Sequence, residues 1–299
     1  MSGKNSIINL GELSKPATVL IEKISDAIGG VFKPYQIVRV AKAEAEAERI
    51  RAESQIQVTD LHRRAFHRFL EEEAKKQKNI EDITYQALPQ LGEKSKPEEV
   101  EDDWITNFFD KCRLISDSEM QSIWSRVLAG EANSPGSYSK RTVDFLSSLD
   151  KTDASLFTNL CVFGWAIGND FIPVIYDVMD EIYNKRGIRF NSLKHLDSIG
   201  LIQFDSLAGY SRIDLPKKFS VLYYGHPVLL ELEKESDNEM EVGNVLLTKV
   251  GEELAPICGS CPDTDFREYV LKRWKKKGYI KEQKTEQGNP ADSTKATHR

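Results

Sequence analysis

The chain has 299 residues, 40% of them hydrophobic, and its 41 basic and 47 acidic side chains give a formal net charge of −6. This balance excludes the global basic field that is typical of nucleic-acid-binding proteins. No run of about 18 apolar residues occurs, and residues 1–15 lack the apolar core of a secretion signal. The four cysteines are irregularly spaced, which fits reduced thiols. We therefore expect a cytoplasmic protein.

Residues 5–32 predict an amphipathic segment, because from Leu13 to Val31 nearly all apolar side chains recur at steps of three or four. Ser14 and Pro16 fit its start, and Gly29 fits its end. The apolar face suits three settings: the protein's own core, a second copy or another protein, or a membrane surface at the inner membrane. The polar face mixes both charges and is a poor match to a basic interfacial helix. The side chains assigned to a partner or membrane are Leu13, Leu20, Ile24 and Ile28.

A long charged helix is expected next, since residues 35–77 contain neither glycine nor proline. At 1.5 Å per residue it spans roughly 65 Å. Its alternating charges are typical of a solvated or self-associating helix of the coiled-coil kind. Arg63, Arg64 and Arg68 form a small basic cluster, which we interpret as a solvated face rather than a phosphate site, because an acidic run follows it. Residues 1–91 are thus predicted to be an assembly region.

Residues 92–152 form a central helical region in this interpretation, and a polar linker at 92–103 opens it. The apolar residues from Trp104 onward predict a short helix. Ser116 or Asp117 can cap the next one, whose apolar stripe includes Trp124, and a further helix should start near Ser139. An indole at helical spacing is more often buried than used to stack on a ligand, so we assign Trp124 to the core.

Residues 153–280 predict a smaller α+β module. A helix is expected from Thr152 or Asp153 to Gly168, and a short one over residues 190–199. Five segments of strand composition follow, which makes the order similar to a winged helix. The fold class is therefore mostly α with a smaller, winged-helix-like α+β part, and residues 281–299 read as a disordered tail. The strand-like segments are 201–204, 210–213, 219–224, 228–232 and 242–247.

A winged helix would present residues 190–199 as its recognition helix. Acidic residues in the wing would repel phosphate, so protein interaction or a scaffold role is favoured over nucleic-acid binding. The residues that would contact nucleic acid are Arg189, Asn191, Lys194 and His195.

The sequence contains little catalytic chemistry. Cys258 and Cys261 form the single C-x-x-C pair, but a zinc site needs two further ligands and a redox dithiol would follow a strand rather than a helix. Reduced thiols are the favoured interpretation. No phosphate-binding, dinucleotide-binding, serine-hydrolase or zinc-protease motif is present. We assign no cofactor, metal or catalytic residue and expect a non-enzymatic protein.

Several segments resemble the bacterial family called domain of unknown function 2806, over about residues 8–275. They include NLGELSKPATVLIEKISDAIGG, KPYQIVRVAKAEAEAERIRAE and LLTKVGEEL. A looser pattern is similar to the Abi-alpha type of phage-resistance protein, with Val127 in place of a usual leucine. That likeness implies a role in abortive infection, an antiviral defence. The segments that carry it are 124–129, 146–153, 199–201 and 247–251.

The resulting hypothesis is a helix-rich defence protein that acts through self-assembly or a protein partner. Two alternatives stay open: a winged-helix regulator that binds nucleic acid, and a peripheral membrane effector.

Overall fold

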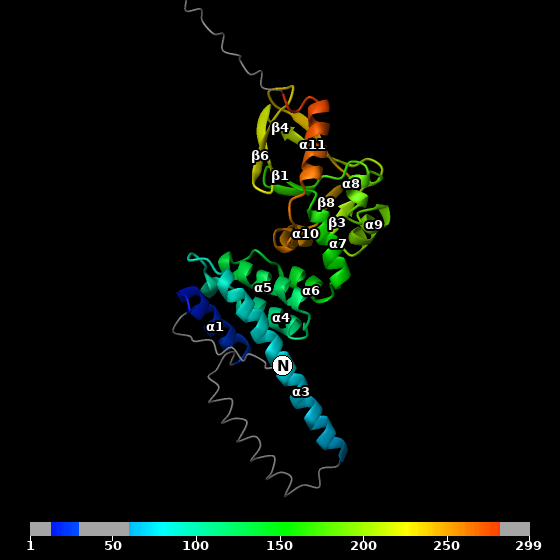
Figure 1. Cartoon of the computed structure of the whole chain (residues 1–299). Helices are drawn as coiled ribbons and strands as arrows, with labels where there is room; N and C mark the ends of the chain where they lie inside the picture. Colours follow the sequence, from blue (N-terminus) through cyan, green and yellow to red (C-terminus); the bar gives the residue numbers. More distant parts are fainter. Residues whose placement is uncertain (1–12, 30–59, 282–299) are drawn as a thin grey trace, which may run out of the picture. The chain divides into compact units, whose positions relative to one another are not determined.

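The computed structural model describes residues 13–29 and 60–281 (Figure 1), and helix predominates over strand in this part of the chain. The expected tail, beyond residue 281, and residues 35–59 of the expected long charged helix lie outside these residues. The chain forms two compact units. The first unit combines the described residues up to Cys161 with Asn191–Gln203 and Leu247–Ser260; the second contains Val162–Phe190, Phe204–Leu246 and the residues from Cys261 onward.

Helix α1 (Lys15–Ile28) begins and ends where the sequence predicts. The side chain of Ser14 accepts a hydrogen bond from the backbone N–H of Ala17 at 3.4 Å. Gly29 ends the helix with a φ of 85°, a conformation that glycine adopts without strain. The predicted amphipathic helix is therefore confirmed.

Helix α1 packs on the first unit itself, against α4 (Asp102–Cys112) and the short helix η3 (Pro97–Glu99). Lys23 anchors the contact: its Nζ donates to the carbonyl oxygen of Glu98 at 3.1 Å. The apolar face of α1 thus belongs to the core of this unit.

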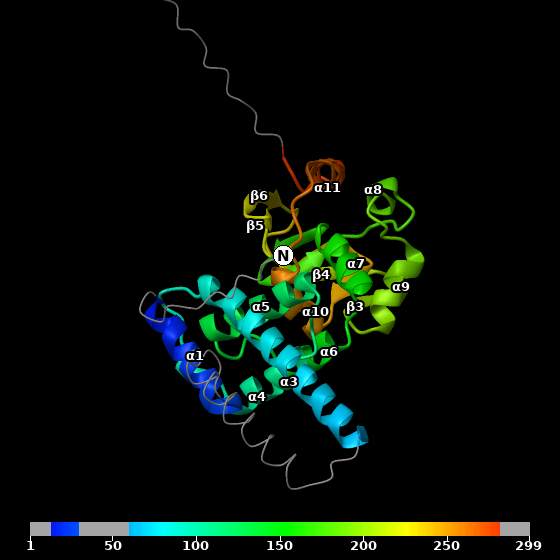
Figure 2. The same cartoon turned by 60° about the horizontal axis from the view of Figure 1, so that its bottom comes forward.

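Helix α3 (Asp60–Ala87) runs continuously to the short helix η2 (Leu88–Gln90) and packs against α5 (Ser118–Asn133). Only its last part lies within the bundle. The first part extends past the ends of α4 and α5 in two views that differ by 60° (Figures 1 and 2).

Helices α5 and α6 (Lys140–Ser147) start at the predicted caps. The carboxylate of Asp117 accepts from the N–H groups of Glu119 and Met120, each at 3.0 Å, and Ser139 caps α6. Trp124 is fully buried and contacts the ring of Phe108 edge-on, with centroids 5.1 Å apart. Its assignment to the core is confirmed.

Helix α7 (Lys151–Cys161) is shorter than predicted. The sequence favours a helix to Gly168, but the chain instead forms a hairpin of β1 (Gly164–Ile167) and β2 (Asp170–Pro173). Strand β1 lies between β2 and β5 (Lys218–Tyr223) in its sheet, so both of its edges are paired. Three of its four residues are buried, so its side chains do not alternate between polar and apolar. A short uninterrupted apolar run fits a helix and a covered strand equally well.

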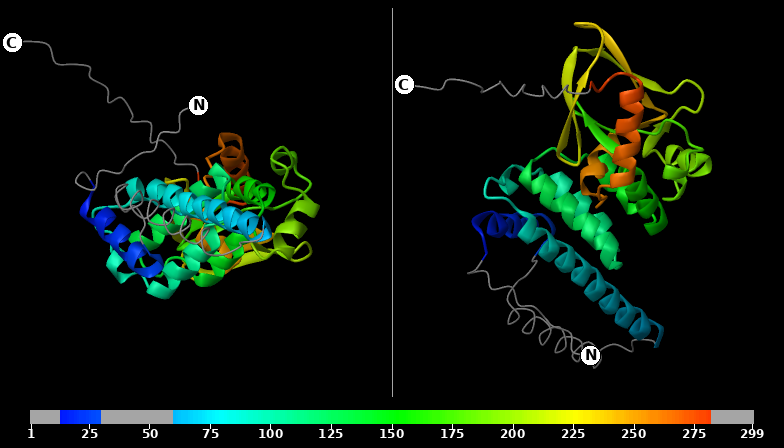
Figure 3. Two further views of the ribbon diagram at one scale, coloured as in Figure 1. Left: turned by 90° about the horizontal axis from the view of Figure 1, so that it is seen from below. Right: turned by 45° about the horizontal axis from the view of Figure 1, so that its top comes forward.

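The second unit is built around strands and one long helix. Its four-stranded antiparallel sheet has the order β2-β1-β5-β6, and β4 pairs with β7. Strands β3 and β8 form a further two-stranded sheet. Helix α11 lies beside the strands of this unit (Figure 3), where Trp274 meets Trp165 with ring centroids 4.7 Å apart. The remaining elements of the two units together are β3 (Ile202–Phe204), β4 (Tyr210–Leu215), β5 (Lys218–Tyr223), β6 (His226–Glu231), β7 (Asn238–Gly243), β8 (Val245–Leu247), α8 (Glu181–Asn184), α9 (Phe190–Ser198), α10 (Lys249–Leu254), η4 (Ala255–Ile257) and α11 (Thr264–Lys276). Helices α10 and η4 and nearly all of α9 belong to the first unit.

Candidate functional site

Four large apolar side chains on the first part of α3 remain open to solvent. Their exposed fractions range from 47% for Phe66 to 65% for Leu61. Phe66, Phe69 and Leu70 follow the i, i+3, i+4 spacing that places side chains on one side of a helix. We define Phe66, Phe69 and Leu70 as the α3 face.

This exposure follows from how α3 is anchored. Its buried residues are Asn79, Ile83, Thr84 and Ala87, all in the last third of the helix. The side-chain amide of Asn79 donates to the carbonyl oxygen of Arg113 at 2.8 Å, which fixes the anchored part. Within the described residues, nothing buries the first part of α3. Contiguous exposed apolar side chains of this kind often mark a site where another molecule binds.

Charged side chains surround the α3 face in a definite order. Basic residues dominate 62–68, and the acidic run 71–73 follows. The charges pair along the helix: Arg64 with Asp60 at 3.4 Å, and Arg68 with Glu72 at 3.3 Å. Exposed pairs of this type contribute only about 0.3–0.5 kcal/mol each. They can therefore exchange for contacts with another molecule at small cost.

Leu20 and Ile24, which were assigned to a partner or a membrane, are fully buried within the first unit. Leu13 and Ile28, at the two ends of α1, are half-buried. The interpretation of this face as a free surface is therefore wrong for Leu20 and Ile24. Since the protein's own core covers them, they cannot contact a bilayer while α1 stays packed.

The residues proposed to contact nucleic acid are at the surface, but two of them face carboxylates. Lys194 pairs with Asp197 at 3.4 Å, and Nε2 of His195 lies 2.8 Å from Oδ1 of Asp153. Arg189 and Asn191 are exposed as well. The local surface around α9 is thus partly neutralised, which weakens its attraction for phosphate.

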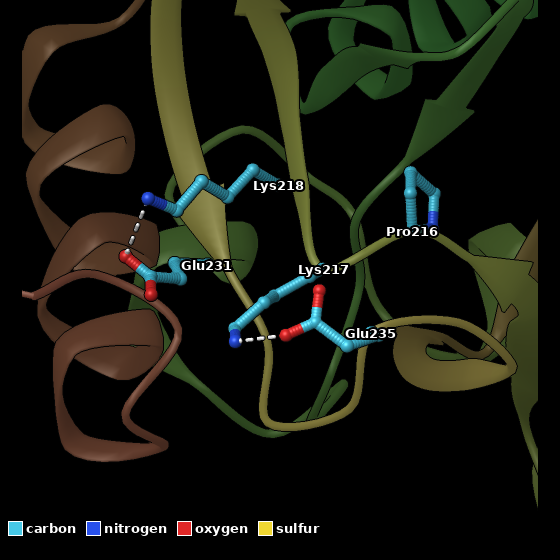
Figure 4. A pocket seen from close by; sticks show the side chains of 5 residues that line it. All are labelled: Pro216, Lys217, Lys218, Glu231 and Glu235. Atoms are coloured by element: carbon cyan, nitrogen blue, oxygen red, sulfur yellow. Dashed lines mark hydrogen bonds and ion pairs between the residues drawn. The ribbon is translucent and has the colours of Figure 1, made fainter.

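A shallow pocket of about 450 Å³ lies on the second unit, between Pro216 and the charged residues around it (Figure 4). Its polar groups satisfy one another: Lys217 bonds Glu235 at 2.5 Å, and Lys218 lies 3.7 Å from Glu231. The bond to Glu235 raises the pKa of Lys217, and a bond from Lys281 lowers the pKa of Glu231. We see no unsatisfied group here that would select a ligand.

The two thiols that are in contact are not the two that the C-x-x-C spacing brings to notice. Sequence reasoning joined Cys258 to Cys261, which is exposed. In the structure the side chain of Cys258 is hydrogen-bonded to that of Cys161, at the end of α7. No C-x-x-C spacing could have indicated this contact. Among residues 13–29 and 60–281, no three metal-ligating side chains gather as a metal site requires.

The described helices include none that is both long enough and apolar enough to cross a membrane. The fold and its exposed groups define a mixed α+β protein whose most distinctive surface is an apolar helix face. The chain belongs to the family described as Protein of unknown function (DUF2806), whose model matches residues 63–271. This agrees with the family expected from the sequence, and the match includes the α3 face. No curated protein and no solved structure matches the chain.

Proposed function

We propose that this protein is a non-enzymatic scaffold that acts by self-assembly, with the α3 face as the contact to a second copy. The observation that carries the proposal is the exposure of Phe66, Phe69 and Leu70 on a helix segment that lies outside its own bundle. Aromatic and aliphatic side chains at the centre with charges at the rim are the usual composition of a protein interface.

The order of charges favours an antiparallel pair of α3 helices. If two copies cross near residue 68, Phe66 of one copy meets Phe69 and Leu70 of the other. Arg63 then lies close to the partner copy's acidic residues at 72 and 73. A parallel pair would instead place basic residues against basic residues, which is unfavourable.

The expected strength of this contact is modest. Complete burial of a Phe or Leu side chain contributes about 1.5–3 kcal/mol, and these side chains are about half exposed. Three from each copy therefore contribute on the order of 6 kcal/mol. Association costs roughly 4–15 kcal/mol, which is similar to this gain. The charge pairs at the rim therefore decide whether the dimer is stable. We expect a concentration-dependent and salt-sensitive dimer.

Light scattering of the full chain tests the proposal. The mass of the wild-type protein should rise above that of a monomer with concentration, and the Phe66→Ser, Leu70→Ser double variant should stay monomeric. Tyr85→Ser is the matched control, because Tyr85 is a 50% exposed aromatic on the same helix but outside the α3 face. A wild-type protein that stays monomeric, for example because residues 30–59 cover the face, would overturn the proposal.

The biological part of the proposal is phage defence, which rests on the looser resemblance to Abi-alpha proteins. Plaque counts on cells with and without the gene test it. If the gene protects cells and the Phe66→Ser, Leu70→Ser variant does not, assembly and defence are linked. Equal plaque counts with and without the gene would contradict the defence role.

Nucleic-acid binding by a winged-helix-like module is the second proposal, and the exposure of Arg189 and Lys194 supports it. In a winged helix, the strand before the helix pair joins the later hairpin; here β1 pairs with β5, which forms a hairpin with β6, and β1 also pairs with β2. Gel shifts at low salt should weaken in an Arg189→Glu, Lys194→Glu variant if this surface binds DNA. Gel shifts that are the same for the variant and the wild-type protein would contradict nucleic-acid binding by this surface.

A further inference from the structure

Two thiols that are far apart in the sequence meet in the first unit. Cys161 is the last residue of α7 and is fully buried. Cys258 follows η4 and is partly accessible to solvent. The two side chains are hydrogen-bonded to each other, so the fold already makes the two thiols neighbours.

The segment that carries Cys258 is held in place from two sides. Oγ1 of Thr158, one turn before Cys161 on α7, donates to the carbonyl oxygen of Cys258 at 3.0 Å. Nη1 of Arg126, on α5, donates to the carbonyl oxygen of Ile257 at 2.6 Å. Both bonds fix the backbone on either side of the thiol.

The surroundings make the two sulfurs chemically unequal. A hydrogen bond from Cys161, with others from Ser260 and Thr158, lowers the pKa of Cys258 to about 6, although burial opposes this effect. Burial raises the pKa of Cys161 well above its ordinary value. These surroundings favour the thiolate form at Cys258 and the thiol form at Cys161, so Cys258 is the sulfur suited to attack first.

We propose that Cys161 and Cys258 form a redox-active thiol pair whose oxidant is a peroxide. The Cys258 thiolate attacks one oxygen of hydrogen peroxide: an S–O bond forms, the O–O bond breaks, and the hydroxide released takes a proton to become water. The sulfur of Cys161 then attacks that of Cys258. The S–S bond forms, the S–O bond breaks, and the leaving hydroxide combines with the proton of Cys161 to give a second water.

In sum, two thiols lose two electrons and two protons, and one peroxide is reduced to two waters. The product is a disulfide that fastens the end of α7 to the segment after α10. The other two cysteines differ in their settings. Cys112 is fully buried in α4, where burial raises its pKa well above the ordinary value, and Cys261 is exposed. The reaction is therefore specific to one pair.

The test is to treat the full-length protein with hydrogen peroxide, alkylate the remaining thiols, and map disulfides by mass spectrometry without reduction. Two of the four thiols should be lost, and the linked peptide should join Cys161 to Cys258. A thiol reductant should restore all four. A Cys258–Cys261 link instead, or loss of no thiol while free cysteine in the same sample is oxidised, would overturn the proposal.

Variants separate the two chemical steps. Cys258→Ser should abolish the disulfide, while Cys161→Ala should stop the reaction at a Cys258 sulfenic acid that a dimedone probe labels. Cys112→Ser is the matched control, a buried thiol outside the pair, and should leave the disulfide unchanged. If Cys161→Ala does not fold, the wild-type disulfide map still decides. Equal dimedone labelling of Cys258 and Cys261 in Cys161→Ala would contradict the assigned order of attack.

Discussion

Glu131 and Glu253 show how single buried carboxylates shape the loop between α5 and α6. The two oxygens of Glu131 accept from the backbone N–H groups of Gly136 at 2.7 Å and Tyr138 at 2.9 Å. Glu253, on α10, accepts from the N–H of Ser139 at 2.8 Å. Backbone groups that leave water need such partners, so the two acids replace the solvent that this loop has lost.

Glu131→Gln should lower the free energy of unfolding by about 1–3 kcal/mol, because the new amide group would face a backbone N–H that loses its acceptor. The cost should depend on pH. Burial raises the pKa of Glu131, although three backbone N–H groups oppose this effect. A raised carboxyl pKa means that the protonated form stabilises the fold at low pH, and that this stability is lost as pH rises through the folded-state pKa.

The glutamine side chain does not titrate, so only the wild-type protein loses stability as the pH rises. The difference in the free energy of unfolding between the wild-type protein and Glu131→Gln should therefore be larger at about pH 5 than at about pH 7.5. Urea unfolding at the two values measures the difference. An equal cost at both would show that burial does not shift the titration of Glu131.

At the scale of elements, Asp117 controls the start of α5. Its hydrogen bond from the N–H of Met120 lowers its pKa, and the ion pair with Lys151 at 3.7 Å adds to this effect. A lowered carboxyl pKa gives stability that is present above the unfolded pKa and is lost as pH falls through the folded one.

Asp117→Asn keeps an oxygen that can cap the helix but removes the charge. The variant should approach the wild-type protein in stability at acid pH and be less stable than it near neutral pH. Chemical unfolding across this range checks the expectation. If the difference is constant with pH, the cap acts through geometry alone.

The helix starts were predictable from the sequence because a cap is a local signal. Ser14, Asp117, Ser139 and Thr248 each bond a backbone N–H within the next three residues. Strand β1 was not predictable, because its environment comes from β2 and β5 and not from its own sequence. The same holds for the site: the charge order of residues 62–73 was visible, but only the fold shows that Phe66 and Leu70 stay uncovered.

The thiol pair was hidden for the same reason. Cys161 and Cys258 approach through tertiary packing of α7 with the segment after α10, whereas the sequence pattern drew attention to Cys261. Long-range contacts of this kind follow from topology and leave no local pattern.

At the scale of the whole molecule, the first unit is not a continuous piece of chain. It includes Asn191–Gln203 and Leu247–Ser260 as well as the residues up to Cys161. A fragment that ends at Cys161 therefore lacks Glu253 and its bond to Ser139. We expect faster tryptic cleavage after Lys140 and Arg141 in this fragment than in the full chain. Equal cleavage rates would show that the N-terminal part is complete without α10.

The central claim, an antiparallel contact between two α3 helices, is tested most directly by charge exchange in sedimentation velocity. Arg63→Glu and Glu73→Arg should each weaken the dimer by placing like charges together, and the two combined should restore it. These positions are too far apart on one helix to pair within a chain.

Arg64→Glu is the matched control, since at 100° per residue Arg64 points about 160° away from Phe66. The account predicts loss of dimer in each single variant, recovery in the double variant, and little change in the control. A double variant that dimerises no better than either single one would contradict the antiparallel α3 contact.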